Sequence, residues 1–376
     1  MKWIPRDLAM ERLGVKSQTL YAYVSRGAIR SRPDEHDSRI SLYSTSDIDS
    51  FVERRRTGRN RTEIAKAAIA WGDPVMETAI TTVRDGTLVY RGQCAITLAE
   101  TATLEEAAAI LWQTEEYPDI SPVLTAVPGA AAKSRLLSSL AAQAATALPG
   151  FGRGHETLVL DGARLLDSAS HAITRHAANI PFHTRLARFW GVGADAEDLI
   201  RRTLVLLADH ELNASTFAAR IAASTGASLA ACALAGCATL TGPLHGEATA
   251  RALAYLRHAV ETRPNTALAA LAARGERVPA VGHPLYPDGD PRAAALITWL
   301  SPSRPVENAI AGAEDAIGKP ANIDMALAAL TVELGLPEDA PFMLFASGRM
   351  VGWVAHAIEQ LTSGKLIRPR AKYVGD

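Results

Sequence analysis

The stretch "TLTGPLHGEATARALAYL", residues 239–256, carries His245 between two glycines, after a proline and before an alanine-rich run. Alanine is a strong helix former, so the run predicts a helix. Glycine allows close approach of a backbone or a ligand. The stretch therefore predicts that His245 lies in the first turn of a helix, where its imidazole is open to a functional role.

Most of the chain has the same helical character. Apolar residues recur at helical spacing from Leu136 to Leu148 and from Leu199 to Leu206, with alanine between them. Two stretches favour strands instead. Residues 78–92 form two alternating runs around Asp85-Gly86, which is a hairpin signal, and residues 29–44 hold short β-type runs. The sequence thus predicts a mainly α fold.

Composition predicts an ordinary globular protein with an uneven charge. The 376 residues are 48% apolar and 21% charged, with a formal net charge of −1. Residues 1–62 hold 13 Lys/Arg against 8 Asp/Glu, whereas the remainder is acidic. Three thinly spread cysteines favour buried thiols in a reducing compartment. With no signal peptide or membrane-length apolar run predicted, we expect a cytoplasmic protein without membrane association.

Residues 9–32 predict a helix, a tight turn at Gly14 and a second helix ending at Gly27. This pattern resembles the winged helix-turn-helix module of the MerR and excisionase-like families. The resemblance implies a module over residues 1–62 that binds DNA, with Arg32 and Arg39 of the wing on phosphates. The polar stretch 54–62 predicts a linker. A small docking or dimerisation unit is the alternative.

Further motifs hold polar residues that suit catalysis or ligand binding. His210 lies in 207–227, His283 in 278–294, Asp324 in 319–330, and Arg349 and Arg368 in the C-terminal part. Each also has a plain structural interpretation: a satisfied histidine, a helix-capping aspartate, a solvated arginine. The pattern contains no metal-ligand spacing, phosphate-binding glycine loop or nucleophile elbow.

In this order, however, the motifs closely resemble citrate synthase, from about residue 76 to the C-terminus. The matching segments are METAITTVRDGTLVYRG with LEEAAAILW, ADHELNAST, GPLHG, GH followed by DPR, NID, GRMVGW and RPR. The resemblance implies an almost wholly helical fold with a large domain over residues 63–246. A small domain over 247–330 closes on the substrates, and residues 331–376 return to the large domain.

The resemblance also implies a reaction, the condensation of acetyl-CoA with oxaloacetate that begins the tricarboxylic acid cycle. Asp324 then matches the base, His245 the donor to the enolate oxygen, and His283 the donor to the oxaloacetate carbonyl. The carboxylate-binding positions of the family match His210, Arg292, Arg349 and Arg368. The family's tail arginine enters the neighbouring subunit, which implies a homodimer. No metal and no cofactor is implied, since coenzyme A enters as a substrate.

Three departures from the family pattern bear on the exact reaction. Glu247 stands where a second glycine is usual, and its charge is expected either to raise the pKa of His245 or to repel an anionic group of the substrate. Pro284 and Pro287 stand where family members commonly have basic residues, and the basic residue usual at position 287 helps to hold coenzyme A phosphates. The family's His-Pro-Met segment is absent from residues 120–170. The alternatives are a methylcitrate synthase, a citryl-CoA lyase, or a DNA-binding metabolite sensor with a synthase-like body.

Overall fold

The computed structural model describes residues 3–25, 29–34, 37, 40–49, 76–121, 129–176, 179–371, 373 and 375. These residues fall into two compact units, Met1–Glu77 and Thr78–Asp376. The predicted helix end at Gly27, the wing residue Arg39 and the linker 54–62 lie outside the described residues.

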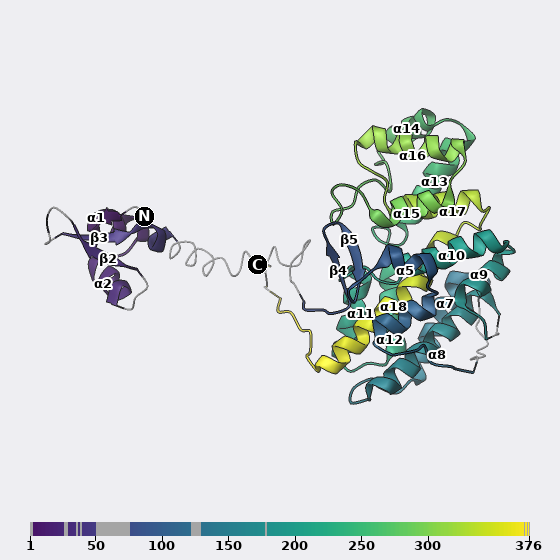
Figure 1. Ribbon diagram of the computed structural model, residues 1–376, viewed down its shortest axis with the longest axis horizontal. Coiled ribbons are helices and arrows are strands. Elements are labelled where there is room, and N and C mark those ends of the chain that lie inside the picture. The colour runs from purple at the N-terminus through teal and green to yellow at the C-terminus, as the bar shows by residue number, and fades with distance from the viewer. Residues whose placement is uncertain are drawn as a thin grey trace. The chain divides into compact units, whose positions relative to one another are not determined.

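The first unit combines short helices with a small sheet (Figure 1). Its elements are β1 (Trp3–Pro5), α1 (Arg6–Leu13), α2 (Ser17–Ser25), β2 (Ser31–Pro33) and β3 (Ser41–Ser44). α1 ends at Gly14, whose φ of 62° is the left-handed conformation that glycine adopts easily, as the predicted turn requires. β2 and β3 confirm the predicted strands, but β1 was not predicted; it pairs antiparallel with β3 and gives the sheet order β1-β3-β2.

The second unit begins with the predicted hairpin. β4 (Thr81–Arg84) pairs antiparallel with β5 (Thr87–Tyr90), and β6 (Gln93–Cys94) follows on β5. Asp85 and Gly86 have φ values of 50° and 72°, so both turn residues are left-handed, as a tight two-residue hairpin needs. The Asp85-Gly86 signal is therefore confirmed.

The remaining named elements of the described second unit are helices, which confirms the mainly α prediction. They are α5 (Ala95–Thr101), α6 (Leu104–Trp112), α7 (Ala132–Thr146), α8 (His155–Thr174), α9 (Phe182–Trp190), α10 (Ala194–Leu207), α11 (Ala214–Ser224), α12 (Leu229–Leu240), α13 (Ala248–Glu261), α14 (Pro264–Ala273), α15 (Pro291–Leu300), α16 (Arg304–Ile317), α17 (Ile323–Glu333) and α18 (Ala340–Ser363). Leu148 departs from the predicted periodicity, because α7 ends at Thr146 and Leu148 is exposed.

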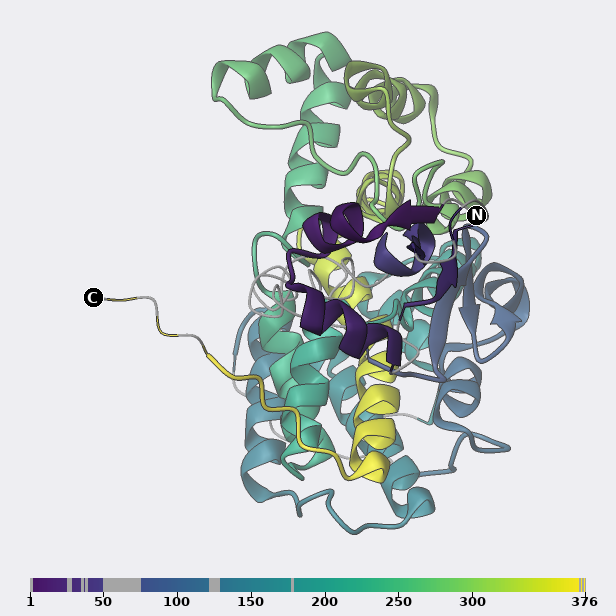
Figure 2. The ribbon, with the colours of Figure 1, turned by 90° about the vertical axis from the view of Figure 1, so that its left-hand side faces the viewer.

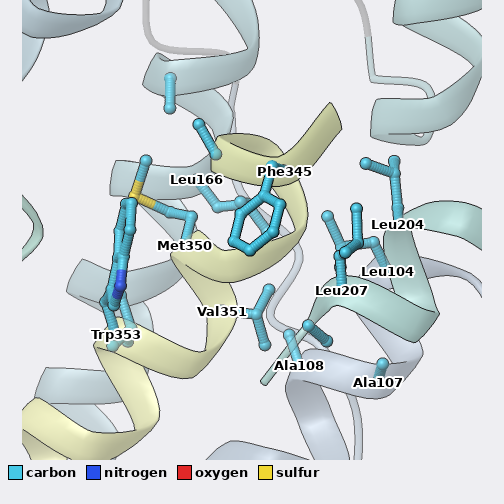
Figure 3. Close-up of a cluster of buried hydrophobic side chains, with 14 of the residues drawn as sticks. Leu104, Ala107, Ala108, Leu166, Leu204, Leu207, Phe345, Met350, Val351 and Trp353 are labelled. Atoms are coloured by element: carbon cyan, nitrogen blue, oxygen red, sulfur yellow. The ribbon is translucent and has the colours of Figure 1, made fainter. Parts of the chain in front are cut away.

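α18 is the centre of the main hydrophobic core. Nearly every residue from Ala340 to Leu361 is buried, as expected for a helix that is apolar on all faces. Figure 3 shows Phe345, Met350 and Val351 of this helix among leucines and alanines of neighbouring helices. Trp353 packs against Gly236 of α12, where a Cβ would lie only 2.8 Å from the indole ring. This close packing fixes the two helices against each other.

A second hydrophobic cluster joins α13, α14, α16 and α17. Figures 1 and 2 both show α14 and α16 at the end of the second unit opposite α8. α17 contributes to both clusters: Ile323 and Leu327 face the main core, whereas Met325 and Ala329 face the second. The helix that carries Asp324 thus lies at the border between two cores.

Candidate active site

Three segments of the second unit bring four sequence-predicted polar residues together. His210 follows α10, His283 precedes α15, Arg292 lies in the first turn of α15, and Arg349 lies inside α18. The imidazoles of His210 and His283 meet edge to face, with ring centroids 5.1 Å apart. Burial lowers the pKa of His210 well below its ordinary value, and the nearby Arg292 and Arg349 lower it further. These four side chains therefore share one buried, positively charged region.

His245 lies in a turn and not, as predicted, in the first turn of a helix, because α13 begins only at Ala248. Its Nε2 is 2.9 Å from Ser215 Oγ. Burial, followed by the charge of Arg349, lowers the pKa of His245 to about 4, so the ring is neutral near pH 7. A neutral imidazole is present, as expected. However, burial and Arg349 lower the pKa of His245, whereas we expected the start of a helix to lower it.

Ser215 determines which nitrogen of His245 carries the hydrogen. Ser215 Oγ donates to Asn213 Oδ1 at 2.6 Å and accepts the indole N–H of Trp353 at 3.2 Å. A hydroxyl has one hydrogen to donate. Because that hydrogen goes to Asn213, Ser215 Oγ accepts from His245, whose ring hydrogen is then on Nε2.

His283 has a tautomer fixed by the backbone. The N–H of Leu285 donates to His283 Nδ1 at 3.2 Å, so a neutral His283 carries its hydrogen on Nε2. Burial, and then Arg292, lower the pKa of His283. Tyr286 Oη lies 2.9 Å from His210 Nε2 and joins the two histidine segments. A neutral N–H donor at His283 is suited to polarising a carbonyl.

Arg292 is almost completely buried at the second residue of α15. Its guanidinium donates to both oxygens of Asp290, from Nε at 2.9 Å and from Nη2 at 2.7 Å. Asp290 Oδ2 also accepts the N–H of Ile323 at 3.1 Å. Asp290 therefore balances the buried arginine and ties the start of α15 to the start of α17.

Arg349 is equally buried but less completely paired. Its Nε donates to the carbonyl of Leu207 at 2.9 Å, and its guanidinium lies 4.8 Å from the ring centre of Phe345. Its Nη2 is buried without a hydrogen-bond partner, and burial lowers its pKa to about 10. An unpaired buried donor is costly, and a carboxylate ligand pairs well with a guanidinium. Arg349 is thus prepared for an anion.

Asp324 is not a helix cap, which rules out its plain structural interpretation. Asn322 caps α17 and accepts the N–H of Asp324 at 3.0 Å. Burial raises the pKa of Asp324 to about 6, although Arg292 acts in the opposite direction. Within the described part of the chain, no hydrogen-bond donor reaches its carboxylate. A carboxylate with a raised pKa and no donor is suited to accept a proton.

Two residues behave differently from the rest of the predicted set. Arg368 lies beyond α18 in an exposed tail, so this chain does not bring it to the other residues. Glu247 forms an ion pair with Lys133 of α7. The first expectation, that Glu247 raises the pKa of His245, was wrong, because burial and Arg349 lower that pKa.

Ser215, Tyr286 and Asp290 were not predicted as site residues. Each lies within seven residues of a predicted site residue, and this closeness in the sequence was the available signal. Among the described residues, no three His, Cys, Asp or Glu side chains are grouped as a metal site requires. The described helices also include none with the length and apolarity needed to cross a bilayer.

Comparison with known proteins identifies the family. The sequence model of the citrate synthase C-terminal domain matches residues 156–370. The citrate synthase of Haloferax volcanii is 34% identical over 220 residues, covering 54% of this chain and 55% of that protein. The 2-methylcitrate synthase of Shewanella oneidensis is 32% identical over 189 residues, covering 46% and 49%.

The chain spans about half the length of the curated relatives it matches. A solved structure of citrate synthase from Thermoplasma acidophilum, in a ternary complex with carboxymethyl coenzyme A and oxaloacetate, superposes with a TM-score of 0.66. Its sequence identity is 25%, and the match covers 81% of this chain and 94% of that one. Because the matched domain takes up more than half of the sequence, the chain belongs to the citrate synthase family.

Proposed function

We propose that the protein condenses acetyl-CoA with oxaloacetate and hydrolyses the citryl thioester to citrate and coenzyme A. One observation carries this proposal: His210, His283, Arg292 and Arg349 lie together in one buried region. The charge of Arg349 also lowers the pKa of His245 and opposes the rise in the pKa of Asp324. The solved relative that holds a coenzyme A analogue and oxaloacetate supports the same substrates.

Each residue has a distinct task in this reaction. Asp324 takes a proton from the thioester methyl group, and His245 donates a hydrogen bond to the enolate oxygen that forms. For that donation from Nδ1, the Ser215 hydroxyl must turn from Asn213 Oδ1 to donate to His245 Nε2 when the thioester binds. His283 donates from Nε2 to the oxaloacetate carbonyl, and the enolate carbon attacks the carbonyl carbon. Water then hydrolyses the thioester and releases coenzyme A.

The oxaloacetate carboxylates are held by arginines. Arg349 offers its unpaired Nη2, and Arg292 shares its charge with Asp290, while His210 lines the same region. Arg368 would come from a partner subunit, which makes the functional unit a homodimer. No metal or organic cofactor takes part, because coenzyme A is itself a substrate.

Domain closure completes the site. We place the small domain at residues 247–330, the large domain at 63–246 and the return segment at 331–376. The separate hydrophobic cluster of α13, α14 and α16 supports this division, with α17 at the border. Closure would carry Asp324 toward the residues of the main core and exclude water while the enolate exists.

The test is release of free thiol, detected with DTNB, from acetyl-CoA and oxaloacetate. Propionyl-CoA in place of acetyl-CoA identifies a methylcitrate synthase, and cleavage of citryl-CoA without synthesis identifies a lyase. Asp324→Ala should abolish turnover, whereas Asp315→Ala, at an exposed position of α16, should not. The absence of thiol release with every acyl-CoA tested would contradict the synthase proposals.

We also propose DNA binding by the module at residues 1–62. The excess of basic residues there and the turn between α1 and α2 at Gly14 support it. The body would then act as a metabolite sensor, with or without catalysis, in a cytoplasmic protein. A mobility-shift assay with random duplex DNA should give binding that weakens as salt is raised. Failure to bind duplex at low salt would remove this proposal.

A further inference from the structure

A cavity separate from the candidate active site lies among α6, α8, α9 and the segment after α6. Its volume is about 200 Å³, and the residues that face it include Glu105, Tyr117, Ser170, Phe182 and Arg185. None of the proposed catalytic or carboxylate-binding residues lines it. The cavity therefore belongs to no part of the proposed reaction.

Three polar atoms of the cavity lining are buried without a hydrogen-bond partner: Glu105 Oε2, Ser170 Oγ and Arg185 Nη1. The other atoms of these side chains are satisfied. Glu105 Oε1 accepts the N–H of Phe182 at 2.7 Å, and Arg185 Nη2 donates to Asp167 Oδ1 at 2.5 Å. Buried polar atoms are nearly always paired, so three unpaired atoms at one cavity indicate a missing polar ligand.

The charges around the cavity define the kind of ligand. Of the charged residues that line the cavity, Glu105 and Asp167 are acidic and Arg185 is basic, so the ionised lining carries a net negative charge. Burial raises the pKa of Glu105, because a carboxylate away from water is less stable than the protonated carboxyl group. A cation beside Glu105 removes the cost of this buried charge, and an anion adds to it. Arg185 is already paired with Asp167, so a neutral oxygen acceptor is enough for its free Nη1.

We propose that the cavity binds a small primary ammonium compound that also carries a neutral oxygen acceptor. The ammonium group donates to Glu105 Oε2, the oxygen accepts from Arg185 Nη1, and Ser170 pairs with either group. At about 30 Å³ per water, the cavity holds about seven water-sized groups. A ligand of about six non-hydrogen atoms, such as an amino acid amide, matches this size.

Isothermal titration of the full-length protein with L-alaninamide tests the proposal. Three compounds of similar size are compared: propionamide lacks the ammonium group, isopropylamine lacks the oxygen, and lactate is an anion. L-Alaninamide should bind with a Kd at least tenfold lower than each comparator. Saturating oxaloacetate should leave this Kd unchanged, because the two sites share no residue. Titration measures a Kd and requires no turnover, so the result does not depend on the proposed synthase activity.

Two variants place the binding in this cavity. Glu105→Gln keeps the acceptor for Phe182 and removes the charge, and it should raise the Kd at least tenfold. Ser170→Ala should raise it several-fold. Ser168→Ala is the matched control, since Ser168 lies on the same helix and bonds to Gln143 outside the cavity. Thermal unfolding checks that each variant is folded.

Three results would overturn the proposal. If L-alaninamide gives no binding at high millimolar concentration, the cavity holds only water. If the folded Glu105→Gln variant binds as the wild type does, the ligand lies elsewhere. If lactate binds as tightly as L-alaninamide, the argument from charge is wrong.

Discussion

The replacement Asp324→Asn tests whether the proposed base is held in a desolvating site. Asparagine has the shape of the protonated carboxyl group and lacks its titration. The pKa of Asp324 is raised from its ordinary value of 3.8 to about 6. A pKa difference of one corresponds to about 1.4 kcal/mol, so the rise from 3.8 to about 6 corresponds to about 3 kcal/mol.

Whether stability rises or falls with pH depends on which form of the Asp324 side chain the folded protein prefers. A raised pKa means that the folded state favours the protonated carboxyl group. The favourable contribution of Asp324 is therefore fully present below about pH 4 and is lost as the pH rises through about 6. We expect Asp324→Asn to unfold with nearly the wild-type free energy at pH 4 and with about 3 kcal/mol more at pH 8.

Denaturant unfolding from pH 4 to pH 8 measures this difference, and Asp315→Asn on α16 is the exposed control, for which we expect no change. Because the base must be ionised, thiol release by the wild type should rise with pH through about 6 and be lost in Asp324→Asn. Equal stability of the wild type and Asp324→Asn at pH 8 would show that the carboxylate is well hydrated. The argument for a desolvated base would then fail.

Two further substitutions test the packing and orientation of the site. Ser215→Ala removes the hydrogen-bond partner of His245 Nε2. We expect it to lower kcat about tenfold, which corresponds to the loss of one net hydrogen bond, with little change in the KM for oxaloacetate. An unchanged kcat would show that Ser215 has no part in the mechanism. Gly236→Ala places a Cβ 2.8 Å from the Trp353 ring and should lower the free energy of unfolding by about 1–3 kcal/mol. The control Ala238→Ser, on the exposed face of α12, should change this free energy by less than about 0.5 kcal/mol. Denaturant unfolding measures both.

Local patterns predicted the elements but not their ends. The hairpin was predicted because Asp85 and Gly86 both adopt a conformation that few residue pairs allow. β1 was missed because a three-residue strand is too short to show alternation, and its pairing with β3 depends on contacts made after folding. His245 was placed in a helix because alanine propensity does not reveal that the turn continues to Glu247.

The site required more than local patterns. Resemblance named His210, His283 and Arg349, yet their chemistry depends on what surrounds them. The sequence does not reveal that Arg349 keeps a buried N–H unpaired, because that depends on packing between α18 and the end of α10. Nor does it reveal that Ser215 lies beside His245, since thirty residues separate them along the chain.

The electrostatics of the region imply an order of events in the proposed reaction. Burial raises the pKa of Asp324, and the charges of Arg292 and Arg349 partly oppose that rise. Oxaloacetate brings two negative charges, which the same arginines balance, so their effect on Asp324 is weakened once it binds. The pKa of Asp324 then rises above its value in the free protein, and the carboxylate becomes a stronger base. Binding of the dicarboxylate therefore prepares the base for the weakly acidic thioester methyl group, which favours oxaloacetate as the first substrate.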